Sequence, residues 1–137
     1  QNFNESKFIE GQGEHSYGEE KNQYGQSFRS SNSYKIYGTS IDYLIDNKIL
    51  KMPDYIKIDV DGTEDLILIG ASKYLKNKKI KSIFIEMNEK NKKKFKKCIK
   101  ILKNNNFKLK GKYRSNFADT VINEKMKGVF NFIFEKK

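Results

Sequence analysis

Charged side chains cluster in residues 54–64, where an apolar strand runs into a turn. The stretch reads Asp-Tyr-Ile-Lys-Ile-Asp-Val-Asp-Gly-Thr-Glu. Because side chains alternate along a strand, Lys57, Asp59 and Asp61 share one face. Charges inside a sheet cost free energy unless they pair or meet a ligand. One interpretation is structural: Lys57 and Asp59 form an ion pair, and Asp61 caps the next helix. The other is a functional site, because acidic groups gather where a strand meets a helix N-terminus.

Two enzyme families resemble this stretch. Residues 59–63, Asp-Val-Asp-Gly-Thr, resemble the D-x-D-G-T signature of haloacid dehalogenase phosphohydrolases. That resemblance implies Asp59 as a phosphate-accepting nucleophile, Asp61 as a general acid/base, and a Mg²⁺ ion that holds the phosphate. The family also uses a downstream acidic pair for the metal, whereas the later strand that ends near Glu86 offers one carboxylate.

A longer pattern resembles the FkbM family of S-adenosylmethionine-dependent methyltransferases. Residues 53–64 are similar to its D-x-x-K-I-D-V-E-G-x-E motif, with Asp61 where Glu is usual. Residues 68–71 are similar to its L-x-G-A segment, and residues 83–87 to its apolar strand ending in I-x-x-E. The likeness extends over residues 34–134 and is looser before them.

The FkbM resemblance implies methyl transfer from S-adenosylmethionine to an oxygen nucleophile, and it favours a sugar or glycan hydroxyl. It implies Asp59, Lys57 and Glu86 as catalytic residues, with Asp59 as the base for the hydroxyl. A base in that role must lie within hydrogen-bond reach of the hydroxyl. The resemblance places Asp59, Val60 and Asp61 against the cofactor.

Three further residues are candidates for binding the acceptor: His15, Ser16 and Asn88. Loops over the carboxyl edge of such a sheet hold substrates, although a histidine on a polar loop is also an ordinary surface residue. Asp59 with Glu86 or Asn88 offers an alternative use, since Mg²⁺ prefers oxygen ligands. We therefore expect S-adenosylmethionine as the cofactor, with Mg²⁺ as the less favoured possibility.

From residue 34 onward, strands alternate with helices. Strands are expected at residues 34–37, 55–60, 80–87, 107–113 and 128–134, and helices after Thr39, from Asp61 to about residue 76, and at 89–104. The alternation predicts an α/β fold with a Rossmann-like, mostly parallel sheet, three αβα layers and an antiparallel C-terminal hairpin.

The Gly-rich cofactor turn of the FkbM family does not follow any apolar strand in this sequence. We therefore expect residues 34–137 to be the C-terminal part of a class I methyltransferase-like domain that is incomplete on its N-terminal side. Whether such a part is active alone stays open. Residues 1–33 are expected to be a loop-rich segment that contacts the acceptor, with one short strand at residues 7–9.

Positive charge is concentrated in one segment. The net charge is +11, and residues 76–112 hold fifteen lysines against two glutamates. The lysines from Lys90 to Lys103 form either a solvated helix face or a surface that binds an anionic partner. Arginine is scarce and few aromatic residues alternate with these lysines, which argues against nucleic acid. A non-enzymatic basic module is therefore a further alternative for the function.

Two features of the composition exclude further classes of protein and of metal site. One Cys and one His exclude a disulfide framework and a Cys/His zinc site. No window approaches the roughly 18 apolar residues of a membrane span, so we expect a cytoplasmic protein. An unpaired strand edge would make an oligomer possible.

Overall fold

The computed structural model describes residues 2–5, 15–17, 27, 29, 32–60, 62–114 and 127–137, with the backbone alone described at 2–5 and 15–17.

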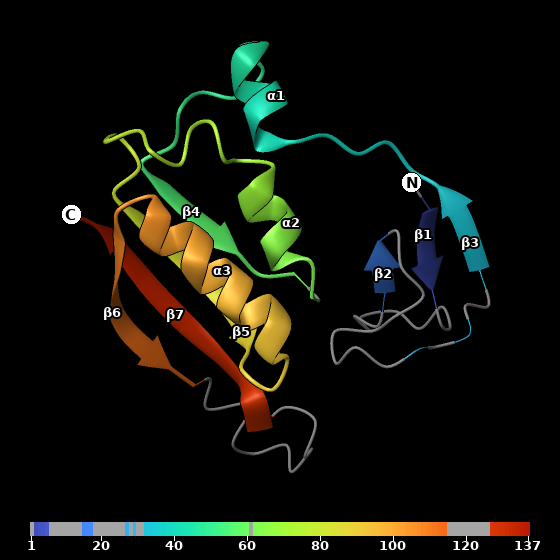
Figure 1. Ribbon diagram of the computed structural model, residues 1–137. Helices are drawn as coiled ribbons and strands as arrows, with labels where there is room; N and C mark the ends of the chain where they lie inside the picture. The colour runs from blue at the N-terminus through green and yellow to red at the C-terminus, as the bar shows by residue number, and fades with distance from the viewer. Residues whose placement is uncertain are drawn as a thin grey trace.

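Four strands form the main sheet, in the order β4-β5-β7-β6 (Figure 1). They are β4 (Tyr55–Ile58), β5 (Ser82–Asn88), β6 (Phe107–Tyr113) and β7 (Val129–Lys136). β4 and β5 are parallel, whereas β7 is antiparallel to both of its neighbours. The α/β class and the antiparallel C-terminal pair are thus confirmed. The expectation of a mostly parallel sheet is wrong for the described strands, because β7 returns beside β6 and enters the sheet between β6 and β5.

Two helices lie on one face of this sheet, α2 (Glu64–Ile69) and α3 (Lys92–Asn104) (Figure 1). The strand sequences explain why: alternate residues of β5 are buried, while those between them are half-buried. The core is formed by residues of the covered strand faces and the facing helix residues: Ile58, Ile83, Ile85, Phe132, Phe134, Leu68, Cys98 and Leu102. The side of the sheet opposite α2 and α3 is called the open face below. The expected three-layer arrangement stays a prediction.

Helix α1 (Ile41–Asp46) begins one residue later than the sequence indicated. Its N-cap is Ser40 and not Thr39, and the Ser40 hydroxyl accepts a hydrogen bond from the Tyr43 amide at 3.1 Å. Asp42 forms its hydrogen bonds with residues outside α1, which explains why the helix begins later. Its amide donates to the Gly70 carbonyl at 2.8 Å, and its carboxylate accepts from the Lys73 amide at 3.1 Å. Helix α1 is therefore anchored to the turn that follows α2.

Helix α2 is shorter than expected and ends before Gly70, with turns continuing to residue 76. A Cβ on Gly70 would lie 3.2 Å from the Cβ of Ser40, so the chain passes close to the start of α1 here. Glycine is also a weak helix former. The close passage and the hydrogen bond from Asp42 together stop the helix.

The N-terminal residues form a second, three-stranded antiparallel sheet, in the order β2-β1-β3. Its strands are β1 (Asn2–Glu5), β2 (His15–Tyr17) and β3 (Asn32–Lys35). The loop-rich interpretation of residues 1–33 therefore missed two strands, and the strand expected at 34–37 lies two residues earlier. The short strand expected at residues 7–9 falls outside the described residues. Figure 1 shows that residues 36–40 connect this small sheet to α1.

Among the described residues, no helix is both long and apolar enough to cross a membrane.

Candidate active site

An ion pair lies at the carboxyl end of β4. The Lys57 ammonium is 2.8 Å from the Asp59 carboxylate, and 66% and 48% of the two side chains are exposed. Lys57 lies in β4 with its side chain on the open face, opposite the buried Ile58, and Asp59 directly follows the strand and contacts Lys57 there. Both groups are solvated because β4 is the edge strand among the described strands. The desolvation argued from the sequence for a central strand therefore does not apply here.

Glu86 lies on the neighbouring strand at the same level. The parallel register pairs Ile58 with Ile85, so the next residues along, Asp59 and Glu86, come side by side. Asp59 raises the pKa of the Lys57 ammonium by accepting its hydrogen bond and by its charge, and the charge of Glu86 raises it further. The structure thus brings together the three residues expected to be catalytic, at one edge of the open face.

The turn after β4 is organised by Gly62 and Glu64. Gly62 has a φ of 88°, a conformation that L side chains rarely adopt. Its amide donates to the Glu64 carboxylate at 2.9 Å, and its carbonyl accepts from the Lys94 ammonium at 2.7 Å. Burial raises the pKa of the Glu64 carboxyl, against the lowering effect of these amide hydrogen bonds and of Lys94. Glu64 is therefore a local acceptor that shapes the turn, as its place in the first helical turn indicated.

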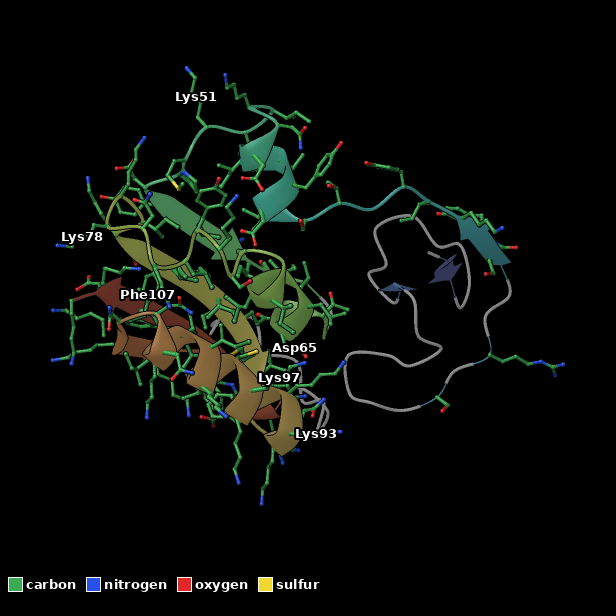
Figure 2. All side chains as sticks on the ribbon, turned by 45° about the horizontal axis from the view of Figure 1, so that its top comes forward. Lys51, Asp65, Lys78, Lys93, Lys97 and Phe107 are labelled. Carbon is green, nitrogen blue, oxygen red and sulfur yellow. The ribbon has the colours of Figure 1, made fainter. Side chains whose placement is uncertain are left out.

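A second acidic residue of the turn was missed by the sequence analysis. Asp65 is buried at the start of α2, and the Lys97 ammonium of α3 lies 2.7 Å from its carboxylate (Figure 2). The Lys94 and Lys97 side chains, three residues apart on α3, both reach toward α2. The spacing of Lys94 and Lys97 could have indicated that both contact a neighbouring helix. Because α3 contains seven lysines in thirteen residues, these two could not be distinguished from the others.

Asn88 ends β5 and is engaged by its own loop. Its side-chain oxygen accepts from the Lys90 amide at 2.9 Å, and its carbonyl accepts from the Asn91 amide at 3.1 Å. A Cβ on Gly128 would lie 2.6 Å from that side-chain oxygen, so β7 packs directly against the turn. Substrate contact by Asn88 stays a prediction, and the geometry gives it a structural task in addition.

The remaining residues predicted to bind the cofactor or the acceptor lie at other places in the chain. Val60 is half-buried beyond the end of β4, and Asp61 lies outside the described residues. His15 and Ser16 belong to β2, where their backbones pair with Glu5 and Asn4. Figure 1 shows β2 away from the carboxyl ends of β4 and β5, so the structure does not bring His15 and Ser16 to Asp59. Their role in acceptor binding stays a prediction.

Two hollows lie near these residues. A small cavity of about 20 Å³ is lined by Val60, Gly62, Glu64 and Lys94 among others, which is room for roughly one water. An open groove of about 410 Å³ lies between the start of α1 and α2, with Thr39 and Thr63 beside Leu66 and Ile67. The second combines apolar walls with a few hydroxyls, as small-molecule sites do. Of these two hollows, the groove alone therefore has a volume in the range of organic-ligand sites.

The described residues contain no group of three or more His, Cys, Asp or Glu that could hold a metal ion. The Mg²⁺ alternative through Asp59, Glu86 and Asn88 thus gains no support from a cluster of carboxylates. Cys98 is a buried residue of α3, and desolvation first, then the charge of Asp65, raises the pKa of its thiol to about 12. It is a core residue and not a nucleophile.

An α/β domain with carboxylates at neighbouring strand ends is typical of enzymes that bind their ligands at that edge of the sheet. The family model of the Methyltransferase FkbM domain matches residues 4–109. That range is more than half of the chain, so the chain belongs to the FkbM methyltransferase family. Searches of curated proteins and of solved structures give no match.

Proposed function

We propose that the chain is an O-methyltransferase that uses S-adenosylmethionine and acts on a hydroxyl group, with a sugar or glycan as the acceptor. The observation that carries the proposal is the Lys57–Asp59 pair at the carboxyl end of β4, beside Glu86. Family membership supports a methyltransferase in general. The hydroxyl acceptor is proposed because the exposed Asp59 carboxylate is suited to accept a hydrogen bond from a hydroxyl group.

The residues at this edge fit the cofactor in their chemistry. The Glu86 carboxylate can accept hydrogen bonds from the ribose hydroxyls, and both carboxylates attract the positive sulfonium. The groove at Thr39 and Thr63 supplies apolar walls for a ring system. When bound, S-adenosylmethionine supplies an electrophilic methyl group.

In the proposed reaction, the acceptor hydroxyl oxygen forms the new bond to the methyl carbon as the carbon–sulfur bond breaks. Asp59 accepts the proton that this hydroxyl loses, which requires a hydrogen bond between the two oxygens. Lys57 fixes the orientation of the Asp59 carboxylate through the 2.8 Å contact. The finer fold assignment, a Rossmann-like three-layer domain, belongs to the same proposal.

Methyl transfer from labelled S-adenosylmethionine to a panel of sugars and glycans tests the proposal. Asp59→Asn is expected to reduce transfer by about 10²-fold or more, the range for losing a general base. Asp46→Asn is the matched control, since Asp46 forms a similar exposed pair with Lys73 at 2.5 Å. Equal activity of the two variants, or transfer only to nitrogen or carbon acceptors, would contradict the proposed chemistry.

A further inference from the structure

A third hollow lies on the other side of α3, away from Asp59. It is an open groove of about 700 Å³ between α3 and β6. The apolar residues that line it come from three elements: Phe95, Ile99, Phe107, Leu109 and Phe134. Most of these are buried or half-buried, but the Leu109 side chain is 55% exposed. The groove therefore offers solvent an apolar floor with one protruding leucine.

The charged residues that line this groove are all lysines. Lys103, Lys108 and Lys137 line it, and none of the lining residues has an acidic side chain. Figure 2 labels Phe107, one of the lining residues, near the C-terminal end of α3. An apolar floor with a cationic rim is complementary to an amphiphile whose head group is anionic.

The exposed surface of α3 extends the same charge. Lys92, Lys93, Lys96, Lys100 and Lys103 are exposed, and within the described part of the chain none of them forms an ion pair. Lys97 and Lys94 differ, because they are bound to Asp65 and to the Gly62 carbonyl. Figure 2 shows side chains such as Lys93 extending from α3 away from the sheet. Residues 92–104 contain no acidic residue to offset them.

We propose that this surface, defined as the exposed lysines of α3 together with the α3–β6 groove, docks on an anionic lipid bilayer. The lysines bind head-group phosphates, and Leu109 enters the acyl boundary beside the groove. A lysine near an anionic leaflet adds to binding, and apolar contact adds further affinity.

Single-stranded nucleic acid is the other polyanion to consider, and the structure disfavours it. Binding of that kind uses aromatic rings on which bases stack. In this groove Phe107 and Phe134 are buried, and Phe95 packs at 5.5 Å between ring centroids against Phe132. The rings are therefore occupied by the core, while the exposed apolar group is the aliphatic Leu109.

Co-sedimentation with vesicles tests the proposal on the intact chain. We expect binding to phosphatidylcholine vesicles that contain about 30% phosphatidylglycerol and little binding to phosphatidylcholine alone. A triple variant, Lys96→Gln, Lys100→Gln and Lys103→Gln, is expected to bind at least about tenfold more weakly. The matched control removes the same charge from the turn before β5, through Lys76→Gln, Lys78→Gln and Lys79→Gln. That control is expected to change binding by less than about threefold, because those lysines lie outside the proposed surface.

Leu109→Gln separates docking from simple charge attraction. The residue is exposed, so the variant is expected to fold while its affinity for anionic vesicles falls several-fold. Binding to poly(U) measured in parallel should not respond to Leu109→Gln. The proposal would be overturned if the two triple variants lost vesicle binding equally, if Leu109→Gln had no effect, or if poly(U) bound more tightly than the vesicles. Circular dichroism of each variant confirms that the fold is retained.

Discussion

The buried carboxylate of Asp65 in the first turn of α2 is held by the Lys97 ammonium of α3, at 2.7 Å. Only 6% of the Asp65 side chain is exposed, whereas 47% of the Lys97 side chain is. One oxygen of Asp65 has no hydrogen-bond partner among the described residues, so the lysine supplies most of the compensation for its burial. The pair joins the two helices that cover the sheet.

We predict that Lys97→Gln destabilises the protein by about 1–3 kcal/mol, because it leaves a buried carboxylate without its cation. Urea unfolding followed by circular dichroism measures the change. Lys96→Gln, an exposed neighbour on the same helix, should change the free energy of unfolding by less than about 0.5 kcal/mol. Equal effects of the two variants would show that the pair contributes nothing specific.

Substitutions of Asn88 can separate its structural role in the turn from its proposed role in substrate binding. Asn88→Ala removes the acceptor for the Lys90 amide and is expected to cost about 1 kcal/mol of stability. Asn88→Asp keeps an oxygen at that place and should retain most of the stability. If a variant of Asn88 keeps its stability but binds the acceptor more weakly, the substrate role is supported. If Asn88→Ala changes neither stability nor acceptor affinity, both roles are contradicted.

Glu64 should make stability depend on pH. Burial raises the pKa of its carboxyl in the folded protein. The folded state therefore binds a proton more tightly than the unfolded state, and stability falls as pH rises from the unfolded pKa through the folded one. Glu64→Gln keeps an acceptor oxygen for the Gly62 amide and removes the charge. We predict that the variant is more stable than the parent at pH 7 and not at pH 4, as measured by urea unfolding. If the difference in the free energy of unfolding between Glu64→Gln and the parent is the same at pH 7 and pH 4, the raised pKa of Glu64 is contradicted.

The Cys98 thiol should resist alkylation in the folded protein. It is buried and its pKa is raised to about 12, so thiolate is scarce at pH 8.5. We expect iodoacetamide to react at least about 100-fold more slowly with the folded chain than with the chain in urea. Comparable rates in the two conditions would mean that α3 is not packed on the sheet as described.

Local apolar patterns predicted several elements of the main sheet and its covering helices. An apolar run indicated β5 at residues 80–87, close to its observed Ser82–Asn88, the helical spacing of Phe95, Cys98 and Leu102 identified α3, and β6 was predicted with its observed bounds. The pairing of Lys57 with Asp59 also followed from local spacing, because the two residues are two positions apart on one strand.

Features that depend on distant parts of the chain were not predictable in the same way. The start of α1 is set by the contact between Asp42 and Gly70, 28 residues away. The edge position of β4 depends on the strand order, and the sheet of β1, β2 and β3 pairs short polar segments without an apolar repeat. The Asp65–Lys97 contact joins two helices, and one helix pattern alone does not indicate it.

Titration of the isotope-labelled chain with S-adenosylhomocysteine, followed by amide NMR, tests the central claim most directly. We predict saturable shifts centred on the amides of Asp59, Val60 and Glu86, with further shifts at Thr63 beside the groove. The same titration of Glu86→Gln should weaken binding by about tenfold, the order of one charged hydrogen bond, while Asp46→Asn should not. Absence of any saturable shift, or shifts confined to the α3–β6 groove, would contradict the placement of the active site at the carboxyl ends of β4 and β5.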